Sequence, residues 1–90
     1  MKIVLPEPFR AKLEGLPTDI KERFKEKIRF LAQNPRHPSL RARKLTNVTI
    51  DGKDVWYARV NRDVRFTYHL EGDVLTLRNI GHHDQALQNP

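Results

Sequence analysis

The fold is decided by residues Val55–Leu70, whose sequence is VWYARVNRDVRFTYHL. On both sides of the polar triplet Asn61–Asp63, side chains alternate with the period of two that is typical of β-strands. Two strands joined by a short polar turn pair antiparallel. This stretch therefore predicts a β-hairpin at the centre of a sheet.

Shorter patterns of the same kind lie on both sides of the hairpin. Toward the C-terminus, Glu71–Asp73 predicts a turn and Val74–Ile80 predicts a strand. Toward the N-terminus, Val48–Ile50 predicts a strand that ends at Asp51-Gly52, which is a strong turn signal. Four strands joined by short turns form an antiparallel meander.

The first 34 residues predict one strand and two helices. Lys2–Leu5 is a short apolar run with β-branched residues, which favours a strand. Pro8–Glu14 predicts a short helix that Gly15 ends, because proline suits the first turn of a helix. Thr18 is the predicted N-cap of a second helix that ends at Asn34. The apolar residues of that helix recur at helical spacing: Ile20, Phe24, Ile28 and Leu31.

The element order β-α-α-β-β-β-β predicts a single α+β domain over residues 1–90, with two N-terminal helices packed on one face of a mainly antiparallel β-sheet. Two helices cannot cover both faces of such a sheet, so the other face is expected to stay partly open. The tail from Asp84 to Pro90 is expected to form a short helical turn or to fray. The alternation places these residues on the open face: Tyr57, Arg59, Arg65, Arg78 and Ile80.

The composition excludes several classes of protein. The 90 residues include no cysteine, so neither disulfides nor thiolate metal ligands are available. No apolar run approaches the ~18 residues of a membrane span, and the apolar start of the chain is too short for a signal peptide. We therefore expect a protein of the cytoplasm that does not enter a membrane.

The chain is basic, and its charge is concentrated in the middle of the sequence. Lysine and arginine number 17 against 11 aspartate and glutamate residues, a formal net charge of +6. The predicted loop 35–44 contains Arg36, Arg41, Arg43 and Lys44 and no acidic residue. Such a cluster attracts phosphate groups. It indicates a nucleic-acid partner or an acidic protein partner, and the two are compatible.

Three arginines are predicted on neighbouring strands of the open face: Arg59, Arg65 and Arg78. Like charges on one sheet face repel each other unless acids lie between them, and Asp63 is the only acid of the central hairpin. One interpretation is a phosphate-binding surface, because guanidinium groups form paired hydrogen bonds to phosphate. The other is a solvated face that neutralises an acidic partner. Tyr57 on the same face is a candidate for stacking on a base or is an ordinary sheet tyrosine.

His82, His83 and Asp84 follow the last predicted strand. Histidine gains and loses a proton near neutral pH, so this segment is a candidate for general acid or base catalysis. Loop histidines without a catalytic role are an open alternative. Metal binding is a weaker one, because successive side chains point apart and three adjacent ligands rarely converge on one ion. We therefore expect no metal.

Several short motifs resemble the RelE/ParE toxin superfamily in their order and spacing. They are Asn34–Leu40 (NPRHPSL), Lys44-Leu45, Val55–Val60 (VWYARV), Asp63–Phe66 (DVRF) and Ile80–Asp84 (IGHHD). The likeness covers nearly the whole chain, and its ending resembles the YafQ-like branch. The resemblance implies a toxin of a type II toxin–antitoxin system, bound by an acidic antitoxin in a heterodimer or heterotetramer. It also implies cleavage of mRNA on the ribosome, without metal or other cofactor, by attack of a ribose 2′-hydroxyl on the neighbouring phosphate.

The resemblance assigns catalytic roles to four residues. His83 matches the catalytic histidine, Asp63 the acid of the turn, and Arg65 the arginine that holds the scissile phosphate. Arg59 falls where these enzymes place a basic residue on the central strand. The residues expected to contact RNA are Arg41, Arg43, Lys44, Tyr57 and Arg78.

The chain departs from the pattern at two points. It has no tyrosine near its C-terminus, as RelE has, and no histidine between His37 and His69, where YafQ-like sites place one. Two alternatives therefore stay open. ParE-like relatives on the same fold inhibit DNA gyrase and are not nucleases, and an inactive relative would only bind its antitoxin.

Overall fold

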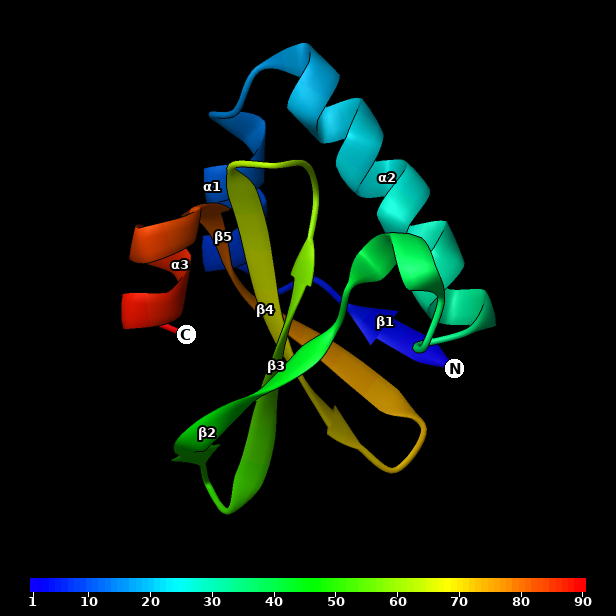
Figure 1. Ribbon diagram of the computed structural model, residues 1–90, viewed down its shortest axis with the longest axis vertical. Coiled ribbons are helices and arrows are strands. Elements are labelled where there is room, and N and C mark those ends of the chain that lie inside the picture. Colours follow the sequence, from blue (N-terminus) through cyan, green and yellow to red (C-terminus); the bar gives the residue numbers. More distant parts are fainter.

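The computed structural model describes all 90 residues and has the predicted α+β architecture, with one further helix (Figure 1). The elements in chain order are β1 (Lys2–Val4), α1 (Glu7–Glu14), α2 (Thr18–Gln33), the short 3-10 helix η1 (Pro38–Leu40), β2 (Arg43–Ile50), β3 (Lys53–Arg59), β4 (Val64–Glu71), β5 (Val74–His82) and α3 (His83–Gln88).

The five strands form one sheet in the order β1-β5-β4-β3-β2. The predicted meander is confirmed, because β2 to β5 pair antiparallel with their neighbours. β1 instead lies parallel to β5, since α1 and α2 carry the chain across the sheet before the meander begins. The central hairpin of β3 and β4 pairs from Val55↔His69 to Arg59↔Arg65.

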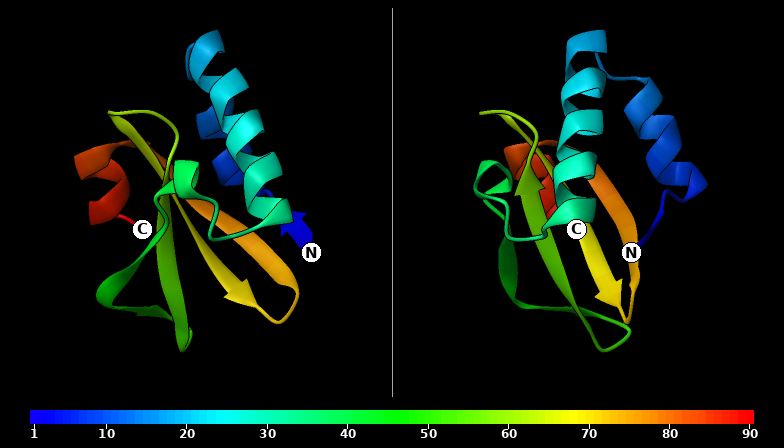
Figure 2. Two further views of the ribbon diagram at one scale, coloured as in Figure 1. Left: turned by 45° about the vertical axis from the view of Figure 1, so that its right-hand side comes forward. Right: turned by 90° about the vertical axis from the view of Figure 1, so that its right-hand side faces the viewer.

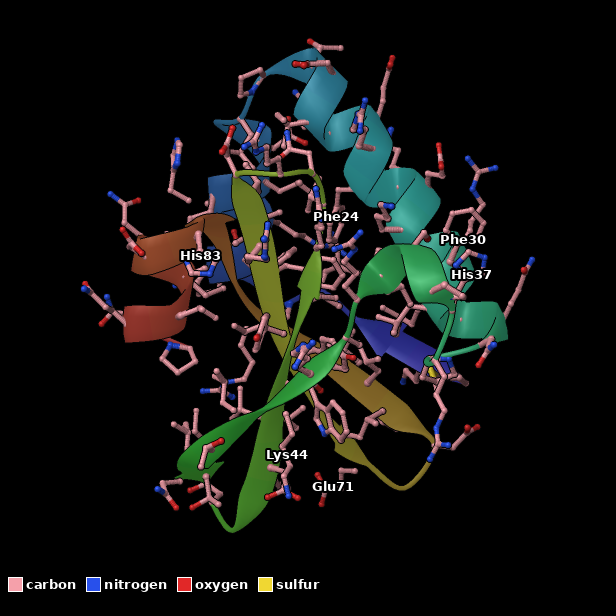
Figure 3. All side chains as sticks on the ribbon, in the orientation of Figure 1. Phe24, Phe30, His37, Lys44, Glu71 and His83 are labelled. Carbon is pink, nitrogen blue, oxygen red and sulfur yellow. The ribbon has the colours of Figure 1, made fainter.

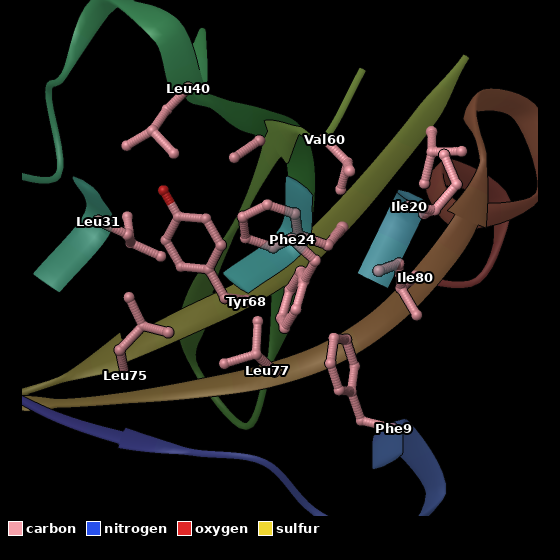
Figure 4. Packing of buried hydrophobic residues seen from close by; sticks show 13 residues of the cluster. Phe9, Ile20, Phe24, Leu31, Leu40, Val60, Tyr68, Leu75, Leu77 and Ile80 are labelled. Carbon is pink, nitrogen blue, oxygen red and sulfur yellow. The ribbon is translucent and has the colours of Figure 1, made fainter. Parts of the chain in front are cut away.

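α1 and α2 cover one face of the sheet and enclose the core with it (Figure 2). Phe24 of α2 lies among the buried side chains that Figure 4 shows. Its ring centre is 5.3 Å from that of Phe66 in β4, in an edge-to-face arrangement. The core cluster consists of Phe9, Ile20, Phe24, Leu31, Leu40, Ala58, Val60, Val64, Phe66, Tyr68, Leu75, Leu77 and Ile80. The alternation of β3 and β4 thus predicted correctly which side chains face the helices.

Ile80 is the exception, because it lies in the core and not on the open face. Tyr68 pairs with Leu77, whereas Phe66 pairs with Ile80, so β5 contains one more residue than β4 between these pairs. This bulge reverses the alternation of β5 and turns Ile80 toward the helices.

Two further expectations are corrected at element boundaries. Thr18 is the first residue of α2 and not its N-cap. The N-cap position is taken by Pro17, and no side chain forms a capping hydrogen bond. β2 begins at Arg43 instead of Val48, so Arg43 and Lys44 lie in a strand and pair with Tyr57 and Trp56 of β3.

The C-terminal tail forms α3, which lies on the face of the sheet opposite to α2 (Figure 2). Ala86 is its buried residue. Side chains of the sheet hold the end of the chain: Thr67 Oγ1 and Arg78 Nε donate to the Pro90 carbonyl at 3.1 Å and 3.0 Å. The open face is therefore smaller than predicted, since α3 covers part of β4 and β5.

Candidate active site

A basic hollow opens on the face of the sheet that α1 and α2 leave uncovered. Its volume is about 690 Å³. It collects side chains from the segment before β2, from β2, β3 and β4, and from the start of α3. The residues that line it are Arg41, Ala42, Arg43, Tyr57, Arg59, Arg65 and His83.

Strand register brings four of these residues together. Arg43 is directly opposite Tyr57, and Arg59 is directly opposite Arg65. Residues in such pairs have Cβ atoms about 5 Å apart, and like charges in this position destabilise a sheet. The hairpin thus places two positive charges side by side where folding alone would disfavour them.

The turn between β3 and β4 holds both arginines through backbone carbonyls. Arg65 Nη1 donates to the carbonyls of Asn61 at 2.7 Å, Arg62 at 3.1 Å and Val64 at 3.3 Å. Arg59 Nε donates to the same Asn61 carbonyl at 3.2 Å. Neither guanidinium forms an ion pair with a carboxylate. The carbonyl dipoles orient the two arginines and leave their charges without counter-ions.

The electrostatics of Arg65 reflect this crowding. Partial burial lowers the pKa of Arg65, and the charge of Arg59 lowers it further, while Tyr57 and Asp63 act in the opposite direction. A guanidinium stays protonated despite such a shift. An anion that enters the hollow would relieve the repulsion between the two arginines.

Asn61 shapes this turn, in which the sequence places it, but its hydrogen bonds were not predicted. Its side-chain Oδ1 accepts hydrogen bonds from the backbone N–H groups of Asp63 at 2.9 Å and Val64 at 2.8 Å. Asparagine commonly forms such bonds at the first position of a turn. That preference agrees with the predicted turn, but it does not predict the hydrogen bonds that Arg59 and Arg65 donate to the Asn61 carbonyl.

His83 is the first residue of α3, and its half-exposed side chain lines the hollow (Figure 3). Its backbone N–H donates to the Asp63 carbonyl at 2.9 Å, which ties α3 to the β3–β4 turn. Its ring Nδ1 lies 3.2 Å from Asp84 Oδ1. Nε2 has no protein partner and stays available to a bound molecule.

The structure separates the nine predicted site residues into two groups. It brings His83, Arg59, Arg65, Arg41, Arg43 and Tyr57 into the hollow. Asp63, Lys44 and Arg78 lie outside it.

Each of the three residues outside the hollow lies beside other groups of the protein. The carboxylate beside the His83 ring belongs to Asp84, so Asp63 supports His83 through its backbone carbonyl only. Lys44 Nζ lies 3.9 Å from a carboxylate oxygen of Asp54. Arg78 holds the C-terminal tail and donates to His69 Nδ1 at 3.2 Å.

The histidines outside the hollow make no cluster of metal ligands. The structure contains no group of three or more histidine, cysteine, aspartate or glutamate residues that could hold a metal ion. His37 stacks on Phe30 at 4.1 Å between ring centres and is hydrogen-bonded to Ser39. Burial and the charge of Arg78 lower the pKa of His69. His82 is exposed.

The model of the family "ParE toxin of type II toxin-antitoxin system, parDE" matches residues 3–87. The chain belongs to the ParE toxin family. It is a toxin of a type II toxin–antitoxin system, within the RelE/ParE superfamily that the motifs resemble. A comparison with curated proteins finds no match.

Solved structures of related toxins have the same fold as this ParE-family toxin. A chain of the archaeal RelE–RelB complex from Pyrococcus horikoshii is 20% identical, with a TM-score of 0.76 over 94% of this chain and 97% of that one. The YoeB/ParE toxin from Agrobacterium tumefaciens is 20% identical, with a TM-score of 0.73 over 92% and 99%. A chain of the RelB–RelE complex from Methanococcus jannaschii is 19% identical, with a TM-score of 0.70 over 91% of this chain and 92% of that one. No helix of the toxin has the length and apolar character that crossing a membrane requires.

Proposed function

We propose that this toxin is an endoribonuclease that cleaves mRNA on the ribosome without a metal ion. One observation carries the proposal: a single hollow combines two arginines without counter-ions and a histidine with a free ring nitrogen. Arginines of this kind bind phosphate, and histidine transfers protons near neutral pH. Together they are the groups that cleavage of a phosphodiester requires.

The free N–H groups of the arginines suit a phosphate. Arg65 is bonded to the protein through Nη1, so Nε and Nη2 can pair with two phosphate oxygens. Arg59 is bonded through Nε, which leaves both Nη groups. A guanidinium that the protein already orients loses little freedom when it binds an anion.

In the proposed reaction, the ribose 2′-oxygen forms a bond to the neighbouring phosphorus and the bond from phosphorus to the 5′-oxygen breaks. The products are a 2′,3′-cyclic phosphate and a 5′-hydroxyl. His83 donates a proton from Nε2 to the leaving 5′-oxygen. The proton of the 2′-hydroxyl passes to water, since no carboxylate lines the hollow.

Arg59 and Arg65 stabilise the negative charge that grows on the phosphate oxygens during this step. Charge stabilisation by preoriented donors is often the largest catalytic contribution. Tyr57 lies between Arg43 and the two arginines on the same face, where its ring can stack on a base next to the scissile phosphate. Asp84 holds the His83 ring, and the Asp63 carbonyl holds its backbone.

The proposal includes two partners. An acidic antitoxin would neutralise the basic surface, as expected for a toxin of this family, and the related RelE chains were solved in complex with RelB. The ribosome would present the mRNA, because an open hollow fixes only part of an RNA strand. Cytoplasmic action follows from both partners.

The test compares wild type with His83→Ala and Arg65→Ala. Wild type is expected to truncate ribosome-bound mRNA, mapped by primer extension, and to arrest growth when expressed without an antitoxin. Both variants are expected to fold, by circular dichroism, and to do neither. If both variants stay fully toxic, the assignment of these residues is wrong.

Inhibition of DNA gyrase is the second candidate, because the family model is that of the ParE toxins. Intact mRNA together with inhibited DNA supercoiling would support it and would overturn the nuclease proposal. Harmless expression with intact mRNA and normal supercoiling would indicate an inactive, antitoxin-binding relative.

A further inference from the structure

A second basic hollow adjoins the candidate active site. Its volume is about 550 Å³, and it lies between α2 and the β3–β4 turn, which run close together in Figure 1. Five cations and one acid line it: Arg23, Lys27, Arg41, Arg59, Arg62 and Asp19.

The cations of the second hollow have no carboxylate partners. None of the five forms an ion pair, although other lysines of the protein do. Lys27 Nζ donates instead to the Ser39 carbonyl at 3.1 Å. Burial lowers the pKa of Lys27; Glu26 raises it, and Arg23 and Arg59 lower it. The second hollow therefore carries a net positive charge, which a bound anion would neutralise.

The two hollows adjoin each other, because Arg41 and Arg59 line both. Arg41 has a φ of 47°, in the left-handed region that residues other than glycine rarely adopt. Its N–H donates to the Pro38 carbonyl at 3.2 Å, which ends η1. This strained residue lies where the two hollows meet, and strain of this kind is concentrated at functional positions.

We propose that the second hollow binds phosphates of the same RNA strand that is cleaved in the first. This rests on the proposed nuclease function and extends it from one phosphate to a track for the RNA backbone. An acidic protein fits less well, because Val60 is the one apolar residue that lines the second hollow. The centre of a protein–protein interface requires buried apolar or aromatic anchors.

α2 supplies a matched pair of variants for the test. Arg23→Gln/Lys27→Gln removes two charges from the second hollow. Lys25→Gln/Arg29→Gln removes two charges with the same spacing from the same helix, beside the apolar groove between α1 and α2. The probe is a short, fluorescently labelled single-stranded RNA with a 2′-O-methyl group on every ribose, which the toxin cannot cleave. Binding is measured by fluorescence anisotropy over a series of KCl concentrations.

A protein that binds single-stranded nucleic acid releases about 0.7 counter-ion for each phosphate that it neutralises. Arg23→Gln/Lys27→Gln is therefore expected to reduce the slope of log K against log salt by about 1.4. Lys25→Gln/Arg29→Gln is expected to leave the slope unchanged. Arg62→Gln, in the exposed turn, is expected to reduce it by about 0.7 and serves as the second variant if the double variant does not fold.

Equal effects of the two double variants would overturn the proposal, because binding would then depend on net charge alone. Unchanged RNA binding combined with weaker binding of poly-glutamate would overturn it in favour of an acidic protein. A selective slope change without any cleavage of ribosome-bound mRNA by wild type would support the second hollow as an RNA site and contradict the nuclease function.

Discussion

The two faces of the sheet in this ParE-family toxin follow opposite rules. On the face covered by α1 and α2, Phe66 and Tyr68 of β4 pack among apolar side chains and are almost fully buried. On the other face of the same strand, Arg65 opposes Arg59 and repels it. The covered face stabilises the folded state by burying apolar side chains. The open face destabilises it, because it concentrates positive charge. The comparison indicates where stability resides and where function does.

The largest expected effect is on the covered face. Phe66→Ala removes a ring that contacts the Phe24 ring and is expected to lower the free energy of unfolding by about 3–5 kcal/mol. Urea denaturation followed by circular dichroism measures it. Tyr57→Ala on the open face of β3 is the control and is expected to cost about 1 kcal/mol. Equal losses would remove the distinction between the faces.

The hydroxyl of Tyr68 is the one polar side-chain group of the core cluster. Burial raises the pKa of its phenol to about 12, from an ordinary value of about 10. The unfolded chain releases the proton above pH 10 while the folded protein keeps it. This contribution to stability is therefore complete below pH 10 and is lost as the pH rises toward 12, by about 2–3 kcal/mol.

Tyr68→Phe is expected to remove this loss. Unfolding by urea at pH 9 and pH 11, for wild type and Tyr68→Phe, provides the measurement. Wild type should lose more stability than the variant between the two values. Parallel losses would show that the phenol has the same pKa in both states.

Asn61 stabilises the turn of the hairpin through its side chain and orients Arg59 and Arg65 through its backbone carbonyl. Asn61→Ala removes the acceptor of two backbone N–H groups and is expected to cost about 1–2 kcal/mol in unfolding free energy. It is also expected to slow mRNA cleavage, because the turn orients Arg59 and Arg65. Asn61→Ser keeps a neutral acceptor and should retain more of both properties than Asn61→Ala. Loss of stability without loss of cleavage would limit Asn61 to a structural role.

The smallest expected effect has the opposite sign. Arg59→Gln relieves the repulsion with Arg65 and is expected to raise the free energy of unfolding by about 0.5 kcal/mol while it lowers the cleavage rate. Thermal and urea denaturation measure the first quantity and ribosome-bound cleavage the second. A lower free energy of unfolding for Arg59→Gln would show that Arg59 stabilises the fold, and it would contradict the repulsion proposed for the open face.

The same comparison explains how much the sequence could predict. The alternation of Val55–Leu70 placed Phe66 toward the helices and Arg59 and Arg65 together on the open face, because a hairpin with a short turn fixes its own register. Ile80 was misplaced, because strict alternation was continued through Arg78 and Asn79, where a bulge adds one residue to β5 and reverses the alternation.

Contacts between segments were less predictable than contacts within the hairpin. The grouping of Arg41 and Arg43 with the hairpin depends on how the chain before β2 folds back, and charge alone could only suggest it. The contact of Asp84 with the His83 ring and the hydrogen bond of Arg65 to the Asn61 carbonyl were not predicted, because tertiary geometry decides which groups reach a ring or a guanidinium.

Our main proposal is that the open face is a catalytic phosphate site. It is tested most directly by the single-turnover rate of mRNA cleavage on the ribosome for wild type, Arg65→Gln and Arg29→Gln. Arg29→Gln removes the same charge from an exposed position of α2, away from both hollows. We expect Arg65→Gln to slow cleavage by about 100-fold or more and Arg29→Gln to keep the wild-type rate, with 2′,3′-cyclic phosphate ends in the wild-type products. Equal rates for Arg65→Gln and wild type would contradict it.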